Sequence, residues 1–197
     1  MRDNLKVTVA ASERESIMSV ILPKQAGTPE GTLLFRESEE ITKLSEGVKI
    51  FNSLKKTLDY YGGVGLAAPQ IGISKKVFIV NLRPEGKNSD LPDIGLKAYI
   101  HPEILGVSEE TNVHAEGCLS VFYATVYGEV ARPNYLKIRY TDLKGNEHTD
   151  EISHPFHARV ILHENDHLHG KIFLQRMKQE DFSRLHWEEN LDIRKNV

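Results

Sequence analysis

The stretch Ile161-Leu162-His163-Glu164-Asn165-Asp166-His167-Leu168 places the pattern HExxH inside an apolar run. On an α-helix, residues four positions apart lie on the same face. His163 and His167 would therefore present two imidazoles to one point, close enough to bind a single metal ion. Glu164 would lie at the edge of that site as a candidate general base. Two imidazole nitrogens and a carboxylate beside bound water are what metal-assisted hydrolysis requires.

The residues before this stretch favour a buried metal site over a chance pair of histidines. The chain has nine histidines, so a pair at helical spacing is modest evidence by itself. However, Phe156, Val160, His163 and His167 recur at intervals of four, three and four residues, which is the buried stripe of an amphipathic helix. Histidines on a core-facing stripe need polar partners, and a metal ion supplies one.

The composition indicates one soluble domain, residues 1–197. The chain has 197 residues, a formal net charge of -3, 40% hydrophobic residues and one cysteine, which rules out an internal disulfide and suits a reducing compartment. No apolar run approaches the roughly 20 residues of a membrane span, and the near-neutral charge predicts no specific nucleic-acid binding and no membrane binding. We expect a cytoplasmic protein, with an organellar location as the alternative.

The hydrophobic periodicity predicts an α+β fold, in which antiparallel or mixed sheets pack around a central HExxH helix. A helix is expected before a glycine-rich stretch, capped by Ser38, and another at the C-terminus. Pro155, Ser153 or His154, and Gly170 are expected to mark the ends of the central helix. The predicted helices are 39–61, 155–169 and 181–190, and the predicted strands are 6–9, 19–22, 76–82, 97–100, 103–107, 126–130, 135–141 and 148–152, with a hairpin turn at 142–146.

A catalytic metal site needs a third protein ligand, and the sequence offers two kinds of candidate. In zincin-like peptidases the third ligand lies downstream, where Glu188 and Glu189 stand. Upstream lies Cys118, beside Gly117, a residue small enough to leave room for a metal. The spacing of the residues leaves both candidates open.

Three motifs in order resemble the peptide deformylase family. Gly63 to Gln70 (GVGLAAPQ) is similar to the family's G-x-G-x-A-A-x-Q, Glu116 to Ser120 (EGCLS) to E-G-C-L-S, and His163 to His167 (HENDH) to H-E-x-D-H. The motif around position 118 contains the single cysteine. A resemblance in three separated motifs is far more specific than HExxH alone.

The resemblance implies a metal-dependent hydrolase that removes the N-formyl group from N-formylmethionine of new polypeptides and releases formate. It implies that Cys118, His163 and His167 bind one divalent metal, typically Fe²⁺ in the cell, with Zn²⁺, Ni²⁺ or Co²⁺ as substitutes. Glu164 would then move the proton. The oxyanion would be stabilised by the Gln70 amide and the Leu119 N–H.

The resemblance also implies how the substrate binds. The backbone near Gly63, Val64 and Gly65 would pair with the peptide as an added strand. We expect an apolar pocket for the methionine side chain. Its lining would come from Val64, Phe156 and Val160, and Glu116 and Gly117 complete the predicted substrate-binding set. Glu116 and Asp166 are expected to orient the metal ligands.

Several positions depart from the family pattern. Phe122 stands where a proline is common, and 122–130 lacks the arginine that contacts substrate main chain. Leu162 replaces a glutamine, and His101-Pro102 replaces Asn-Pro. Arg159, one helical turn before His163, is a candidate replacement for the missing arginine.

The predicted partners are formylated nascent peptides, with a transient contact to the ribosome. Residues 178–197 carry four basic against five acidic side chains, a net charge of -1, which gives no electrostatic argument for RNA binding. Two alternatives stand beside the deformylase: a zincin-like metallopeptidase, and a formyl-peptide-binding relative with reduced activity.

Overall fold

The computed structural model describes residues 32–84 and 90–187 of the chain. The strands predicted at 6–9 and 19–22 lie outside the described residues. The helices are η2 (Leu33–Phe35), α3 (Leu44–Tyr61), η3 (Ala68–Ile71), η4 (Phe122–Ala124), α4 (Pro155–Leu168), η5 (Phe173–Arg176) and η6 (Gln179–Arg184). The strands are β1 (Gly65–Ala67), β2 (Val77–Leu82), β3 (Gly95–Val107), β4 (Thr111–Gly117), β5 (Val126–Pro133), β6 (Leu136–Thr141), β7 (Glu147–Ile152) and β8 (His186–Trp187).

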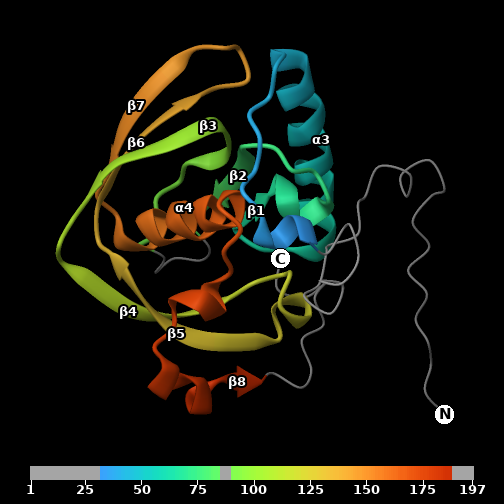
Figure 1. Ribbon diagram of the computed structural model, residues 1–197. Coiled ribbons are helices and arrows are strands. Elements are labelled where there is room, and N and C mark those ends of the chain that lie inside the picture. Colours follow the sequence, from blue (N-terminus) through green and yellow to red (C-terminus); the bar gives the residue numbers. More distant parts are fainter. Residues whose placement is uncertain (1–31, 85–89, 188–197) are drawn as a thin grey trace, which may run out of the picture.

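The strands form two antiparallel sheets around α4. The large sheet has the order β1-β2-β3-β6-β7, and the small sheet has the order β4-β5-β8. Figure 1 shows α4 between these sheets, while α3 packs on the other side of the large sheet. This arrangement confirms the predicted α+β class, with antiparallel sheets and a helix before the glycine-rich stretch.

Strand β2 is apolar at nearly every position because both of its faces are covered. Phe78 packs in one core cluster with Ile161 of α4, whereas Ile79 packs in another with Leu54 of α3. A strand that is covered on both faces needs apolar side chains at successive positions. β2 therefore ties the position of α4 to the rest of the sheet.

The ends of α4 follow the sequence signals. Pro155 occupies the first turn, and the ring of His154 accepts a hydrogen bond from the N–H of His157 (3.5 Å). Gly170 follows the helix with φ +68°, and a Cβ there would lie 2.6 Å from the carbonyl carbon of Phe35. Both the conformation and the close approach of η2 require glycine at this position.

The start of α3 differs from the prediction. The helix begins at Leu44 rather than at position 39, and Ser38 does not cap it. Instead Ser38 N–H donates to Leu168 O (2.8 Å), and Glu39 forms a bridge to Lys75. These long-range backbone contacts hold the segment before α3 extended. The apolar periodicity of the sequence does not register such contacts, so the predicted helix starts too early.

Three further elements differ from the prediction. The segments 97–100 and 103–107 form the single strand β3, which bends at His101 (φ +49°). β4 was not predicted, because most of its side chains are exposed and few are apolar. The described part of the predicted C-terminal helix is the short 3-10 helix η6 followed by β8.

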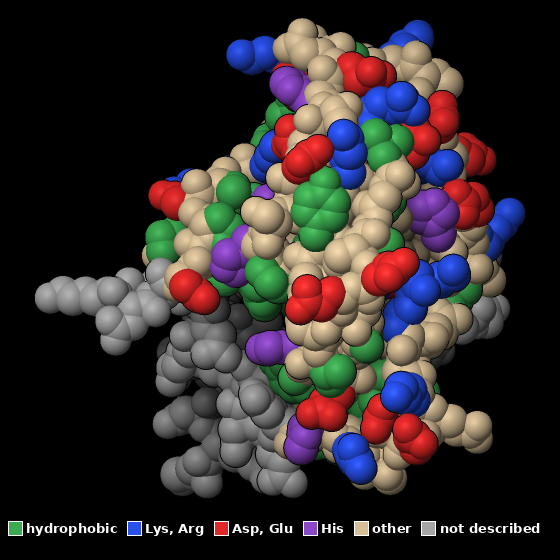
Figure 2. Space-filling model, turned by 90° about the vertical axis from the view of Figure 1, so that its left-hand side faces the viewer, with side chains coloured by type: hydrophobic (Ala, Val, Ile, Leu, Met, Phe, Trp, Pro, Cys, Tyr) green, Lys and Arg blue, Asp and Glu red, His purple; other side chains and the backbone are tan. Residues whose placement is uncertain are grey.

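The surface and the helices agree with the composition. On the face shown in Figure 2, basic and acidic side chains are interspersed over the described residues. In the described ranges, every helix is too short or too polar to cross a bilayer.

Candidate metal centre and active site

The two histidines of α4 converge on Cys118 at the end of β4. The ligand atoms of Cys118, His163 and His167 all lie within 4.8 Å of one another. The Cys118 sulfur lies 3.3 Å from Nε2 of His167. Of the two kinds of third ligand that the sequence offered, Cys118 is at the site, whereas positions 188 and 189 lie outside the described residues.

The donor set fits a divalent metal. Although burial raises it, the neighbouring His167 and His163 lower the pKa of the Cys118 thiol to about 5, which favours the thiolate that metals bind. His163 donates from Nδ1 to Glu116 (2.9 Å), which leaves the Nε2 lone pair for a ligand bond. A thiolate and two imidazoles suit zinc and first-row transition metals.

Glu164 lies beside this donor set, in a position that Gly65 of β1 makes available. A Cβ at Gly65 would lie 2.5 Å from Oε1 of Glu164, so glycine is needed for the carboxylate to pack there. Within the described residues, Oε2 of Glu164 is buried and has no hydrogen-bond partner. Burial raises the pKa of Glu164 to about 7, a value suited to accepting and returning a proton near neutral pH.

The amide of Gln70 is oriented toward the same point. Its Oε1 accepts a hydrogen bond from Ala67 N–H (2.8 Å), which fixes the orientation of the amide. Nε2 therefore faces Cys118 Sγ (3.4 Å) and Ser120 Oγ (3.3 Å). Leu119 lies in the turn after Cys118 and lines the same cavity. The site thus has an amide donor beside the metal-ligand set.

A buried network of charges holds Glu116 against His163. Arg132 makes two hydrogen bonds to the Glu116 carboxylate, both 2.9 Å, and Arg159 makes one of 2.6 Å. Although burial opposes it, hydrogen bonds to His163 and Arg132 hold the pKa of Glu116 well below its usual range. The prediction that Glu116 orients a metal ligand therefore agrees with the geometry.

The network also bears on the roles expected for Asp166 and Arg159. Asp166 reaches neither histidine; its carboxylate accepts from Arg132 Nη1 (2.6 Å) and Arg176 Nε (2.9 Å). Any effect of Asp166 on the ligands passes through Arg132. Arg159 is 3% exposed, and its guanidinium donates to Glu116, Val130 O and Asn112. These acceptors engage the guanidinium, and Arg159 also lines the cavity at the site, so its role as a replacement for the missing substrate arginine stays a prediction.

Sequence reasoning missed Arg176, which donates to Asp166, and above all Arg132. It lies on β5, outside the three motifs, and its spacing from them carries no periodic signal. The available clue was chemical: Glu116 and Asp166, two acidic residues inside motifs expected to be buried, need a cation. That clue gives the charge of the partner but not its position.

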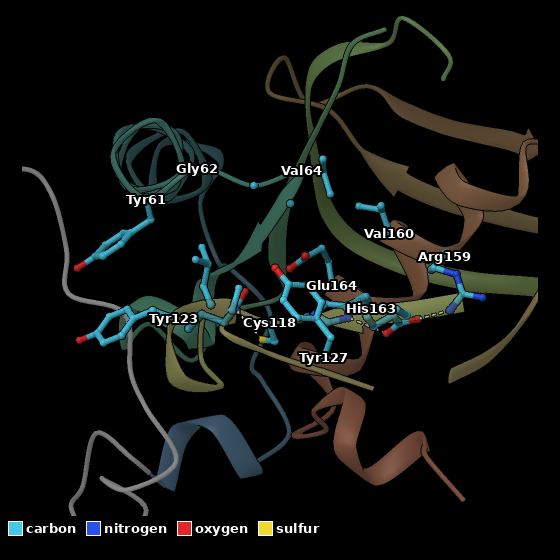
Figure 3. A pocket seen from close by; sticks show the side chains of 18 of the residues that line it. Tyr61, Gly62, Val64, Cys118, Tyr123, Tyr127, Arg159, Val160, His163 and Glu164 are labelled. Carbon is cyan, nitrogen blue, oxygen red and sulfur yellow. Dashed lines mark hydrogen bonds and ion pairs between the residues drawn. The ribbon is translucent and has the colours of Figure 1, made fainter. Parts of the chain in front are cut away.

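A cavity of about 310 Å³ opens onto the site (Figure 3). It includes every residue of the predicted substrate-binding set. Gly117 has a further role that was not expected, because a Cβ there would lie 2.7 Å from the ring of Tyr127. Glycine at 117 is therefore required by Tyr127 on the paired strand β5, and the room that it leaves for a metal stays a prediction. The lining residues are Tyr61, Gly62, Gly63, Val64, Gly65, Gln70, Ala115, Glu116, Gly117, Cys118, Leu119, Tyr123, Ala124, Tyr127, Phe156, Arg159, Val160, His163 and Glu164.

Comparisons with known proteins agree with this arrangement. The family model for polypeptide deformylase matches residues 24–183. The peptide deformylase of Thermotoga petrophila is 36% identical over 146 residues, which cover 74% of this chain and 81% of that protein. A ligand-bound crystal structure of class I type b peptide deformylase from Acinetobacter baumannii matches with a TM-score of 0.72 at 32% identity, over 82% of this chain and 99% of that one. The Met-Ala-Ser-bound structure of the Acinetobacter baumannii enzyme matches with a TM-score of 0.71 at 30% identity, over 82% and 98% of the two chains. Because the family model spans most of the sequence, this chain belongs to the polypeptide deformylase family.

Proposed function

We propose that this chain hydrolyses the formamide bond of N-formylmethionine at the start of new polypeptides and releases formate. The observation that carries the proposal is the convergence of Cys118, His163 and His167, with Glu164 packed beside them. Family membership supports the same activity. We assign it to one catalytic domain that includes the described residues.

The proposed chemistry divides between the metal and the chain. A divalent metal held by Cys118, His163 and His167 would lower the pKa of water from about 15.7 toward about 7 and polarise the formyl carbonyl. Glu164 takes the proton of the attacking water and passes it to the nitrogen that leaves. Its raised pKa, about 7, suits both transfers.

Two donors of the chain stabilise the oxyanion in this proposal. They are Nε2 of Gln70 and the backbone N–H of Leu119. Because Ala67 N–H fixes the Gln70 amide, this donor is oriented before the substrate arrives. Loss of one such donor typically costs about 2.7–4 kcal/mol of barrier.

The free edge of β1 is the proposed binding site for the substrate main chain. Among the described strands β1 pairs only with β2, and Gly63 to Gly65 line the cavity. The substrate would add as a strand, so its recognition depends little on the residues after methionine. Val64, Phe156 and Val160 would enclose the methionine side chain. The Met-Ala-Ser complex of the structural relative supports peptide binding in this family.

We propose ferrous iron as the metal in the cell, with zinc, nickel or cobalt as substitutes. The mixed thiolate and imidazole donors accept all four ions. The partners would be nascent peptides that carry formylmethionine, met during a transient contact with the ribosome.

The direct test is formate release from formyl-Met-Ala-Ser by protein prepared without oxygen. Oxygen must be excluded because oxidation of ferrous iron or of Cys118 would abolish activity for a trivial reason. We expect formate, its loss on chelation, and its return when ferrous iron is added. Peptide binding without formate would favour the binding-protein alternative, and cleavage of internal peptide bonds would favour the zincin-like alternative.

A further inference from the structure

An arginine on α4 and the metal ligand one turn after it bind the same carboxylate. Arg159 precedes His163 by four residues, so the two side chains share a face of the helix. Nη1 of Arg159 donates to Oε1 of Glu116 (2.6 Å), and Nδ1 of His163 donates to Oε2 (2.9 Å). Figure 3 shows Arg159 beyond His163, on the side away from Cys118. Glu116 of β4 therefore joins two successive turns of α4.

Both oxygens of this carboxylate are held from two sides. Oε1 also accepts from Nε of Arg132, and Oε2 accepts from Nη2 of the same guanidinium, both at 2.9 Å. Each oxygen of Glu116 thus has one donor from β5 and one from α4. Without Arg159, Oε1 would keep its donor from β5 only, and the carboxylate could turn away from the helix. The imidazole of His163 would turn with it, because a metal-binding histidine is oriented by the acceptor of its second nitrogen.

Asn112 of β4 holds the other end of the Arg159 guanidinium. Nη2 donates to the backbone oxygen of Asn112 (2.9 Å) and to its Oδ1 (2.6 Å), and Nη1 donates also to Val130 O (2.9 Å). Arg159 is buried, and an interior guanidinium is stable only where acceptors meet its N–H groups. Asn112 supplies both acceptors of Nη2, so it determines how the guanidinium faces Glu116.

The amide of Asn112 is itself oriented by a neighbour. Its Nδ2 donates to Oδ1 of Asn134 (2.5 Å), which leaves Oδ1 of Asn112 for Arg159. The backbone N–H of Asn134 donates to Oγ of Ser108 (3.0 Å) and to Glu110 O (3.1 Å). A continuous series of hydrogen bonds therefore runs from the turn between β3 and β4 to a metal ligand. Asn112 and Asn134 lie outside the three motifs and outside the cavity described above.

We propose that Arg159 and Asn112 are positioning residues for the metal ligand His163. Arg159 holds Glu116 against the helix, and Asn112 holds Arg159 in the orientation that this contact needs. In this role neither side chain touches the metal or the substrate. Groups that orient a ligand without binding the metal typically change metal affinity or activity by about 10- to 100-fold. The effect on formate release rests on the proposed function, whereas the effect on metal binding does not.

The first test measures metal binding by the full-length protein without any substrate. Zn²⁺ affinity is measured by competition with a chelator, and the visible absorption spectrum is recorded after loading with Co²⁺. Arg159→Met removes the donors and keeps an unbranched side chain, so it should weaken zinc binding by roughly 10- to 100-fold and shift the cobalt bands. Asn112→Ala, a milder change at a half-buried position, should do the same to a smaller extent. Arg139→Met is the matched control, because the pair of Arg139 with Glu103 is exposed on both sides and its loss should leave both readings unchanged.

A double variant tests whether Asn112 acts through Arg159. If it does, adding Asn112→Ala to Arg159→Met should leave the zinc affinity at the value of Arg159→Met alone, because the link between the two residues is already broken. Losses that add would overturn the positioning role of Asn112.

Kinetics of the metal-saturated proteins separate positioning from contact with the substrate. With formyl-Met-Ala-Ser, Arg159→Met should lower kcat by roughly 10- to 100-fold and leave KM near the wild-type value. An arginine that contacts the substrate predicts the reverse, a raised KM with kcat unchanged.

Wild-type zinc affinity with an unchanged cobalt spectrum in folded Arg159→Met would overturn the proposal, as would a change confined to KM. An equal loss in Arg139→Met would also overturn it, because the effect would then come from lost positive charge in general. If Arg159→Met does not fold, Asn112→Ala carries the same comparison. If the wild-type protein yields no formate, the proposed function fails, and the zinc and cobalt measurements still decide the positioning role.

Discussion

Glu164 carries the proton transfers in the proposed reaction, although it is not a metal ligand. Glu164→Gln keeps the shape of the side chain and removes its basicity. We expect formate release to fall by about 10²–10⁴-fold, the usual contribution of a general base. Bound metal should stay near the wild-type level, because the three ligands are intact. Elemental analysis and formate assays on one sample check both outcomes, and near wild-type turnover would exclude this role.

His157 predicts a pH dependence of stability outside the active site. Burial, with smaller contributions from Lys97 and His154, lowers the pKa of His157 to about 4 from the ordinary value of 6.5. A depressed histidine pKa gives stability that is present above pH 6.5 and lost as the pH falls toward 4. The slope from this residue is about 1.4 kcal/mol per pH unit.

The measurement is urea unfolding of wild type and His157→Gln between pH 7.5 and pH 4.5, a window chosen to span roughly this titration. The variant should be less sensitive to acid than the wild type, whatever its stability at pH 7.5. The same acid sensitivity in both proteins would mean that His157 does not titrate in this way.

Individual residues could be predicted from the sequence where a motif fixes both identity and spacing. Cys118, His163 and Glu164 belong to such motifs, and the structure brings them together. Arg132 and the contacts of Asp166 could not be predicted, because they depend on which strands become neighbours. Pairing across 34 positions of sequence leaves no local pattern.

Strand β1 and helix α4 approach so closely that a glycine separates them. Gly65→Ala would place a methyl group 2.5 Å from Oε1 of Glu164. We expect a loss of about 1–3 kcal/mol in the free energy of unfolding and a lower kcat, because the carboxylate must move. Gly106→Ala is the matched control, since nothing lies within 4 Å of a Cβ at that position of β3.

Thermal unfolding and formate release check this prediction. The control should stay within about 0.5 kcal/mol of wild type and keep its activity. If Gly65→Ala behaves like Gly106→Ala, the close packing of Glu164 against β1 is wrong.

Elements with strong periodicity could be predicted, and weakly apolar ones could not. β2 and α4 are recognisable because each buries a continuous stripe or run. β4 exposes most of its side chains and is held by its pairing with β5, so its sequence has the polar composition that is typical of a loop. The extended segment before α3 was missed for a similar reason, because its partners lie near positions 75 and 168.

At the scale of the whole molecule, a buried cation of the small sheet reaches α4. Arg132 of β5 bridges Glu116 of β4 and Asp166 of α4, and all three side chains are at most 7% exposed. Arg132→Met would break this bridge, leaving Glu116 with Arg159 and Asp166 with Arg176 as the remaining cationic partners. We expect a loss of about 3–5 kcal/mol in the free energy of unfolding, the usual effect of breaking a buried ion pair.

The same substitution at Lys137 is the control for Arg132→Met. Its pair with Glu151 is 3.2 Å long but exposed on both sides, so Lys137→Met should change stability by less than about 1 kcal/mol. Urea unfolding at matched metal loading compares the two variants. Equal effects would show that the buried network does not hold the small sheet against α4.

The class of the fold could be predicted because two helical patterns are separated by several alternating segments. The division of the strands into two sheets could not be predicted. It depends on the turn after Gly117 and on strand pairings that leave no local sequence pattern. That division places Cys118 opposite α4. The metal site is therefore a property of the whole arrangement, although its ligands come from two short motifs.

The most direct test of this arrangement is the metal bound per chain in Cys118→Ala, measured by elemental analysis after reconstitution without oxygen and desalting. We predict close to one metal ion per chain in the wild-type protein and close to none in the variant, because two histidines alone hold the ion weakly. Full metal content in a folded Cys118→Ala protein would contradict the assignment of this sulfur as a ligand.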